Sequence, residues 1–395
     1  MFSEATRQFI QQHRYDDVRQ LALHTNILSG VEVDIAHALT QIAGRQLIEH
    51  KLPSWYELDS IIYPVRISLE QCSSELTARY KASLLSGKSF VDLTGGFGVD
   101  CAFIAKKFHE ATYVERQKEL CEIVACNFSS LKLDHIKVEN IDTVDYLREM
   151  SPVDCIFIDP ARRSETGRKT VAISDCEPNL NEIQDVLMQK AGYVLVKLSP
   201  MLDISLALKS LRNVYQVHVV SVGNECKELL FLMREDYASE PEFICVNLKA
   251  GRDQVAFSSL QSEEKETKIT CTPEVKKYLY EPNASILKAG FYKKLAAEYN
   301  VDKLHSDSHL YTSESFLPDF PGRIFQIEDV VSMNKKELKS AFQGETKANI
   351  ATRNFPISVA ELRKKLKLKE GGEIYLFATT LANGKHVLLK TIKSI

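Results

Sequence analysis

A short glycine-rich segment is the part of this chain whose residue types point most directly to chemistry. Residues 92–98 read Asp-Leu-Thr-Gly-Gly-Phe-Gly and follow the apolar pair Phe90-Val91, which predicts a buried strand that turns into a helix over 99–108. Glycines allow a sharp turn and a close approach of the backbone, and a helix N-terminus offers free N–H groups to a ligand. The segment therefore predicts a nucleotide-like cofactor site. We expect five of its residues to bind the cofactor: Asp92, Thr94, Gly95, Gly96 and Gly98.

Acidic residues occur where such a cofactor would need them. Glu115 ends a predicted strand over 111–115, and a carboxylate there can accept hydrogen bonds from both ribose hydroxyls. Asp142 ends a predicted strand over 136–142 and could reach an adenine amino group. Asp100 would lie near the pyrophosphate of a dinucleotide, where a negative charge is poorly placed, but this charge is tolerable beside a cationic sulfonium ligand. Glu115 therefore fits both a dinucleotide such as NAD and a sulfonium cofactor, whereas Asp100 favours the sulfonium cofactor.

A fourth strand, over 153–158, ends in Asp159-Pro160. With it, residues 75–235 resemble a class I S-adenosylmethionine-dependent methyltransferase. Residues 92–98 match the first motif of that family, and Asp159-Pro160 match the fourth. Glu115 and Asp142 match the ribose and adenine positions between them. The resemblance implies S-adenosyl-L-methionine as the cofactor, with Asp159 also among the residues that bind it.

The resemblance implies an α/β fold with a Rossmann-like, seven-stranded methyltransferase sheet. Alternation of strands and helices predicts a parallel sheet whose two faces are covered. Segments 192–198, 215–222 and 228–233 predict the fifth to seventh strands. An antiparallel pair formed by the last two distinguishes such a sheet from that of a dehydrogenase. Before the sheet, apolar residues at helical spacing predict an N-terminal helical domain.

The acceptor is expected near the end of the fourth strand, with Asp159, Pro160 and Lys197 as catalytic residues. Amino-methylating members of the family carry Asp/Asn-Pro-Pro followed by Tyr or Phe, whereas this chain has Asp159-Pro160-Ala161-Arg162-Arg163. The departure removes the aromatic ring that stacks on the target base. Arg162 and Arg163 suit contact with phosphate, and a guanidinium can also stack on a base. We expect the polar segment 162–179, which also holds Arg168 and Lys169, to order over the acceptor.

A second possible set of catalytic residues is a tetrad of two lysines and two acids. FtsJ-like ribose 2′-O-methyltransferases use a Lys-Asp-Lys-Glu tetrad, and Lys81, Asp159, Lys197 and Glu228 occupy corresponding places. A lysine between carboxylates could take a hydroxyl proton. However, Lys81 lies closer to the first motif than in that family, and such common residue types can match by chance.

Charge is uneven along a chain whose net charge is −3. Residues 321–395 carry 14 Lys and Arg against 7 Asp and Glu, and five of the basic residues fall within 363–369. This segment resembles the THUMP-like α+β domain of a bacterial methyltransferase group, and residues 281–290 resemble the ferredoxin-like segment that precedes it. Asn383-Gly384 between two alternating runs predicts a hairpin. THUMP domains in general bind RNA, so we expect Arg363, Lys364 and Lys365 to contact it, although a solvated helix face would also explain them.

The remaining expectations concern organisation and location. Nine scattered cysteines include no Cys-x-x-Cys pair, so we expect no metal site. Without a signal-like segment or an apolar run of membrane length, a cytoplasmic protein with no membrane partner is expected. The expected domains are a helical domain (1–72), a Rossmann-like methyltransferase domain (73–240), a strand pair with a linker (241–275), a ferredoxin-like segment (276–320) and a THUMP-like domain (321–395).

Together these features predict an S-adenosylmethionine-dependent methyltransferase that acts on RNA, either tRNA or rRNA, with the C-terminal domain helping to bind the nucleic acid. Two other readings stay open: methylation of a small molecule or protein, and a non-catalytic RNA-binding module. A nicotinamide oxidoreductase is a more distant alternative. The target nucleotide, the methylated atom and the oligomeric state are left open by the sequence.

Overall fold

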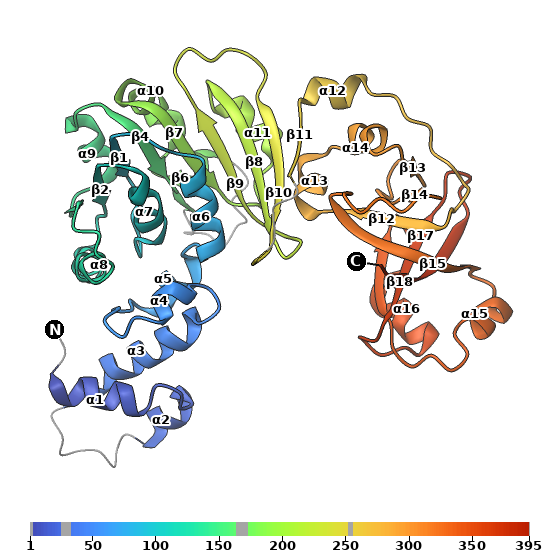
Figure 1. Ribbon diagram of the computed structural model, residues 1–395, viewed down its shortest axis with the longest axis horizontal. Coiled ribbons are helices and arrows are strands. Elements are labelled where there is room, and N and C mark those ends of the chain that lie inside the picture. Colours follow the sequence, from blue (N-terminus) through green and yellow to red (C-terminus); the bar gives the residue numbers. More distant parts are fainter. Residues whose placement is uncertain (1–2, 25–32, 163–172, 252–255, 395) are drawn as a thin grey trace. The chain divides into compact units, whose positions relative to one another are not determined.

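The computed structural model describes residues 3–24, 33–162, 173–251 and 256–394 (Figure 1). The chain divides into two compact units. The first comprises residues 1–215 and 229–239, and the second comprises residues 216–228 and 240–395. Arg163, Arg168 and Lys169 lie outside the described residues. Among the described helices, none is long and apolar enough to span a membrane.

The first unit begins with helices. Each of the longer ones starts at a residue that caps it: Ser3 Oγ accepts from the N–H of Thr6, and Asp34 Oδ1 accepts from that of His37. Phe9, Ala38 and Ile42 form a small core between the first and third helices. The helices are α1 (Glu4–Gln12), α2 (Val18–His24), α3 (Ile35–Ile48), α4 (Pro53–Tyr56), α5 (Arg66–Gln71) and α6 (Glu75–Ser83).

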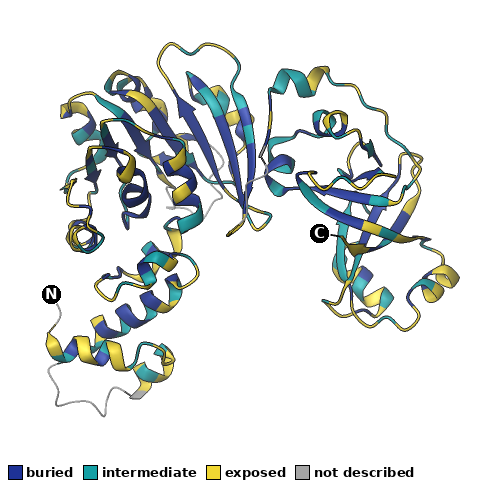
Figure 2. Ribbon diagram, viewed as in Figure 1, coloured by how far each residue is buried: buried dark blue, intermediate teal, exposed yellow. Residues whose placement is uncertain are grey.

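A twisted sheet follows, with the order β9-β7-β4-β1-β2-β3 within this unit. All neighbours are parallel except β9, which runs antiparallel to β7. Figure 2 shows the strands as buried, as expected where helices cover both faces. The strands are β1 (Ser89–Asp92), β2 (Glu110–Val114), β3 (Ile136–Glu139), β4 (Val153–Ile158), β7 (Ala191–Leu198) and β9 (Glu225–Met233).

The connections are mainly helical. The helix expected over 99–108 is an α-helix that tightens into a 3-10 turn at Ala105–Lys107. A two-stranded ribbon pairs β5 (Ala161–Arg162) with β6 (Cys176–Glu177), which follows a 3-10 turn at Ile173–Asp175. The helices are α7 (Val99–Ile104), α8 (Lys118–Ser130), α9 (Thr143–Glu149), α10 (Leu180–Lys190) and α11 (Ile204–Ser210).

The second unit contains two groups of strands. In the first, β10 (Glu242–Leu248) pairs in parallel with β8 (Val214–Val222) and antiparallel with β11 (Ala256–Ser259). The seven strands expected for the methyltransferase sheet are therefore all formed, as β1 to β4 and β7 to β9, and the following pair adds to β8. The fold class predicted from the sequence is confirmed.

The second group is a seven-stranded, mostly antiparallel sheet with the order β13-β14-β12-β15-β18-β17-β16. Its strands are β12 (Tyr278–Pro282), β13 (Asp302–Lys303), β14 (Tyr311–Ser313), β15 (Gly322–Ser332), β16 (Asn349–Arg353), β17 (Ile374–Thr380) and β18 (His386–Lys393). The hairpin expected at Asn383-Gly384 joins β17 to β18, with Thr380 opposite His386. The helices are α12 (Gln261–Glu266), α13 (Ala284–Ala289), α14 (Lys293–Glu298), α15 (Lys335–Ala341) and α16 (Val359–Leu366).

Candidate active site

The glycine-rich segment forms a tight backbone cradle between β1 and α7. The N–H of Gly95 donates to the carbonyl of Val114, and Gly96 and Gly98 have φ values of +52° and +76°. A Cβ on Gly95 would lie 2.1 Å from Cε2 of Tyr113, whose hydroxyl donates to the carbonyl of Gly96 at 2.5 Å. Glycine is therefore required at 95 for lack of space, and at 96 and 98 for backbone conformation.

Asp92 stands at the carboxyl end of β1, beneath the cradle. Its side chain is buried, and its Oδ1 accepts from the N–H of Thr94 at 3.0 Å. Its Oδ2 is buried without a hydrogen-bond partner among the described residues. Burial raises the pKa of the Asp92 carboxyl well above its ordinary value. A buried carboxylate oxygen without a donor is unfavourable, so this position suits a ligand that brings a donor or a positive charge.

Glu115 follows β2 and faces the same cradle. Its Oε2 accepts from the N–H of Gly96 at 3.1 Å and its Oε1 from that of Gln117 at 2.9 Å, which fixes the carboxylate beside the turn. Each oxygen keeps a further lone pair, so the carboxylate can still accept ligand hydroxyls. Asp142 is exposed at the start of α9, where its Oδ1 caps the helix by accepting from the N–H of Val144 at 2.8 Å.

The carboxyl ends of β1, β4 and β7 bring three of the expected residues together. The main-chain N–H of Asp159 donates to Oγ1 of Thr94 at 2.6 Å. Nζ of Lys197 donates to Oδ2 of Asp159 at 2.5 Å. Pro160 follows and is buried. Thr94 therefore links the glycine cradle to the place expected for the acceptor.

Asp100 has a role that the sequence did not reveal. It is buried, and its carboxylate accepts from the hydroxyl of Ser73 at 2.7 Å and lies 3.2 Å from Nζ of Lys81 and 3.6 Å from Nζ of Lys197. Burial raises its pKa, but the two lysines outweigh burial and the pKa is lowered. The protein itself balances the charge of Asp100, so this charge does not favour a sulfonium over a dinucleotide. An acidic residue in the first turn after the glycines was the available signal.

Three of the four residues of the proposed tetrad belong to the first unit. These are Lys81, Asp159 and Lys197: Asp100 lies close to both lysines, and Lys197 pairs directly with Asp159. Glu228 is buried and belongs to the second unit. The additional acid at 100 lies between the two lysines.

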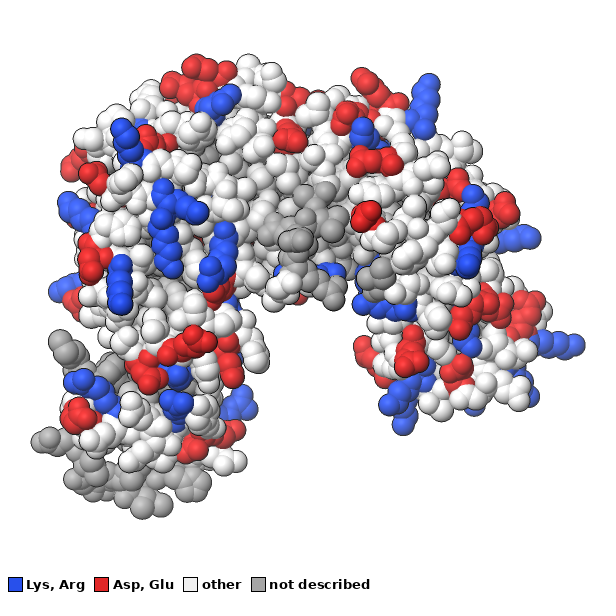
Figure 3. Space-filling model, in the orientation of Figure 1, with Lys and Arg blue, Asp and Glu red and all other residues white. Residues whose placement is uncertain are grey.

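The basic residues expected to contact the substrate lie on separate segments. Arg162 is the second residue of β5, opposite Cys176, and Arg163 is outside the described residues. In α16, Lys364 and Lys365 are exposed in the last turn, and Nη1 of Arg363 donates to the carbonyl of Ala348 at 3.3 Å. On the face drawn in Figure 3, the Lys and Arg side chains of the second unit are interspersed with Asp and Glu.

More basic residues surround the end of α16 than the sequence run indicates. Lys347 and Lys369 form a bridge between their backbones, and Arg363 reaches the carbonyl of Ala348 next to them. Lys367 caps the helix in a left-handed conformation with φ of +57°. We call Lys347, Arg363, Lys364, Lys365, Lys367 and Lys369 the α16 basic cluster.

Comparison with known proteins places these features in context. A crystal structure of a provisionally assigned methyltransferase from Porphyromonas gingivalis W83 matches over 100% of both chains, with 34% sequence identity and a TM-score of 0.89. The model of a THUMP domain-like family matches residues 322–391, and that of a ferredoxin-like domain matches residues 278–321.

Other solved structures match part of the chain. An rRNA methylase from Streptococcus thermophilus is 12% identical with a TM-score of 0.30, covering 40% of this chain and 93% of its own. TrmK from M. capricolum, solved with S-adenosyl-homocysteine, is 12% identical with a TM-score of 0.33, covering 42% and 70%. The comparison with curated proteins found no match.

Proposed function

The chain belongs to the family of the Porphyromonas gingivalis protein, and from this we propose that it is an S-adenosylmethionine-dependent methyltransferase that acts on tRNA or rRNA. The observation that carries the proposal is the cradle, in which the unpaired Oδ2 of Asp92 lies beside glycines that leave no room for side chains. These residues fit a cofactor that carries both a cationic group and a nucleoside.

The cofactor would be held from three strands. Asp92 would accept from its ammonium group, Glu115 from its ribose hydroxyls, and Asp142 would stand at its adenine. The glycines would let backbone N–H groups approach the cofactor. The hydrogen bond from the N–H of Asp159 to Thr94 would hold the cradle next to Asp159. When bound, S-adenosylmethionine supplies an electrophilic methyl group.

The acceptor would approach Asp159 and Lys197. The Asp159 side chain is 36% exposed, whereas that of Lys197 is 13% exposed, so Asp159 is the more accessible of the pair. Asp159 would orient the acceptor by accepting its N–H or O–H, and Lys197 in its neutral form would take the proton that the acceptor loses. Most of the rate gain would come from holding acceptor and methyl group in line.

RNA is the acceptor class that the second unit supports. The family match at residues 322–391 is THUMP-like, and residues 321–395 carry twice as many basic as acidic side chains. No ion pair is found within the described residues for any member of the α16 basic cluster, so its charges are available to phosphates. The cluster would position the RNA, and the target nucleotide would then enter beside Asp159.

Calorimetry tests the cofactor half of the proposal. Titration with S-adenosylmethionine and with S-adenosylhomocysteine should each give a saturable heat, whereas NAD should give none. The sole tryptophan, Trp55, is buried and packs on Phe97 of the cradle with ring centroids 5.2 Å apart, so its fluorescence should report the same binding. Absence of binding would favour a non-catalytic module.

Mass spectrometry tests the acceptor. Nucleosides from tRNA and rRNA of cells with and without the gene should differ by one methylated species. Purified protein and labelled S-adenosylmethionine should restore that species to RNA from the deficient cells. Cofactor binding together with unchanged RNA nucleosides would favour a small-molecule or protein acceptor.

A further inference from the structure

A line of buried charged groups runs from α6 to the acceptor edge of the sheet. Lys81 on α6 is fully buried, and its Nζ lies 3.2 Å from Oδ1 of Asp100. Oδ2 of the same carboxylate lies 3.6 Å from Nζ of Lys197, which in turn donates to Asp159. Charge therefore alternates along Lys81, Asp100, Lys197 and Asp159.

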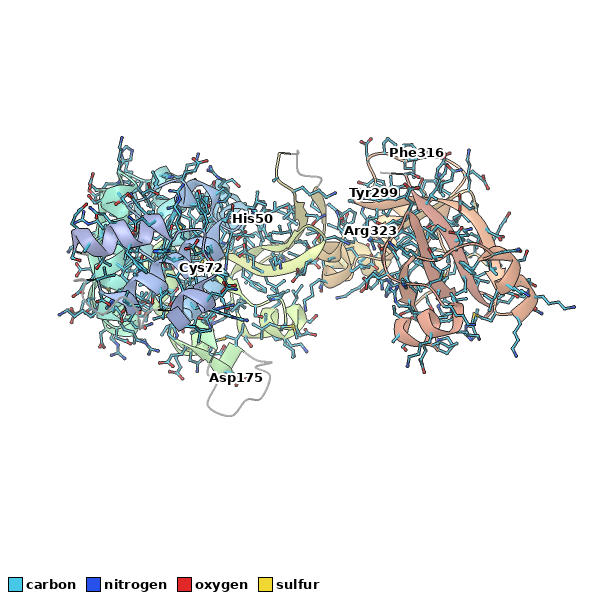
Figure 4. The ribbon with its side chains drawn as sticks, turned by 90° about the horizontal axis from the view of Figure 1, so that it is seen from below. His50, Cys72, Asp175, Tyr299, Phe316 and Arg323 are labelled. Atoms are coloured by element: carbon cyan, nitrogen blue, oxygen red, sulfur yellow. The ribbon has the colours of Figure 1, made fainter. Side chains whose placement is uncertain are left out.

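Other groups from neighbouring elements also face this line. Ser73, just before α6, donates to Asp100 and accepts from Nζ of Lys81 at 3.2 Å. The positive charge of Lys197 acts to lower the pKa of Asp92 on β1 and of Cys72, although burial raises both. Cys72 is labelled in Figure 4. Asp100 contacts both lysines, so α6 can act on Lys197 through this carboxylate.

We propose that Asp100, balanced by Lys81, is a positioning residue that fixes where Lys197 lies and how readily it gives up its proton. The proposal rests on the function proposed above. Asp100 holds the Lys197 ammonium from behind while Asp159 holds it from the acceptor side. Lys81 offsets part of the negative charge of Asp100. The protonated form of Lys197 is therefore stabilised less than it would be by Asp100 and Asp159 alone.

The proposed methyl transfer requires Lys197 to be neutral when the acceptor loses its proton. In the proposed reaction the bond from sulfur to the methyl carbon would break as the bond from acceptor oxygen or nitrogen to that carbon forms, and neutral Nζ of Lys197 would take the acceptor proton. Lys197 must therefore lose its own proton first, to solvent, before each turnover. A lysine held by two uncompensated carboxylates would do so only at high pH, and Lys81 lowers that pH.

Two substitutions of similar shape should have opposite effects. Asp100→Asn removes a carboxylate, so Lys197 should lose its proton at a lower pH than in the wild type. Lys81→Met removes the positive charge that offsets Asp100 from the side of α6, so Lys197 should lose its proton at a higher pH. Each shift should be about one pH unit or more, the usual effect of one charge at this distance. A purely structural role would give no such opposition.

Competitive labelling of the full-length protein with acetic anhydride measures the effect without any acceptor. The reactivity of Lys197 is followed by peptide mass spectrometry across a pH series, and the rising limb of methyl transfer to RNA from deficient cells is recorded beside it. Lys190→Met is the control, because Lys190 precedes the amino end of β7, far along the strand from Lys197, and its Nζ donates to the carbonyl of Met150. It should leave the labelling curve of Lys197 unchanged.

The outcomes separate this inference from the proposed function. Opposite shifts in the two variants support it, and shifts of the same sign, or none, overturn it. If either variant fails to fold, as judged by circular dichroism and Trp55 fluorescence, the double variant Lys81→Met/Asp100→Asn replaces it. That variant removes both charges and should return the labelling curve close to that of the wild type, whereas a displaced curve would contradict the inference. Loss of cofactor binding in the wild type would instead refute the proposed function.

Discussion

At the scale of single residues, the site depends on atoms that the protein leaves incompletely satisfied. Oδ2 of Asp92 is buried with no donor among the described residues, and the turn at Gly95 has no space for a methyl group. The unpaired buried oxygen costs stability in a protein without its ligand, and glycine at 95 costs backbone entropy on folding. We infer that they are kept because the cofactor needs them, and each can be tested separately.

Asp92 should make stability depend on pH. Its pKa in the folded chain is raised above the ordinary value of 3.8, so the folded state binds this proton more tightly than the unfolded state. The resulting stability is present below the unfolded value and is lost as pH rises through the folded value. In Asp92→Asn this loss should disappear, so the variant should gain stability relative to the wild type between pH 4 and neutrality. Urea unfolding followed by Trp55 fluorescence measures it, and parallel curves would contradict it.

Gly95→Ala should strongly weaken cofactor binding while the chain stays folded. The added Cβ would meet the ring of Tyr113 at 2.1 Å, and that ring is fixed by its hydrogen bond to Gly96, so the cradle must shift. We expect affinity for S-adenosylmethionine to fall at least about 100-fold, since a displaced turn loses several hydrogen bonds. Gly192→Ala, whose Cβ would lie 3.2 Å from its nearest neighbour at the start of β7, is the control. Equal affinities in the two variants would show that the cradle does not bind the cofactor.

At the scale of elements, one buried carboxylate joins three strands of the second unit. Glu281 on β12 is 1% exposed and accepts from Nε of Arg323 on β15, labelled in Figure 4, and from Nη2 of Arg353 on β16, each at 2.7 Å. β12 belongs to the ferredoxin-like match, and the other two strands belong to the THUMP-like match. These charge-assisted bonds therefore link the two matched segments.

Glu281→Gln should loosen that link. A neutral amide cannot pair with two guanidinium groups, so the free energy of unfolding of the second unit should fall by about 1–3 kcal/mol. We expect faster hydrogen exchange in β15 and β16, measured by mass spectrometry, and unfolding at a lower urea concentration. Glu328→Gln, at an exposed position on β15, should change neither quantity. Equal exchange in both variants would mean that the arginines do not depend on Glu281.

At the scale of the whole molecule, charge is divided unevenly although the net charge is only −3. The excess of basic residues lies in the THUMP-like part, and the α16 basic cluster is its densest region. RNA binding through such a surface releases counterions and must weaken as salt rises.

Replacing three lysines of the cluster should change that salt dependence. In the full-length protein carrying Lys364→Gln, Lys365→Gln and Lys367→Gln, the slope of log affinity for tRNA against log salt should become shallower by about 2–3. The matched control replaces the lysines of α15, Lys335, Lys336 and Lys339, which are also exposed. Fluorescence anisotropy at several salt concentrations gives both slopes. An equal loss in both variants would indicate nonspecific attraction to the unit as a whole.

Local patterns in the sequence were sufficient for much of this picture. The glycine segment, the acids that follow β2 and β4, the succession of strands and helices and the terminal hairpin depend on turn chemistry and on the period of apolar residues, which act between neighbours in the chain. Parallel strands then bring Asp92, Glu115 and Asp159 to one sheet edge, because their carboxyl ends align there.

The contacts of charged groups were decided only by the tertiary structure. No local pattern relates Lys81 on α6 to Asp100 on α7, or Glu281 to Arg353, because each pair meets only after separate elements pack. For the same reason Asp100 was expected to face a ligand, whereas the protein itself neutralises it. The sequence determines which groups are available for chemistry, and packing determines which of them remain unpaired for a ligand, because burial makes every unpaired charge costly.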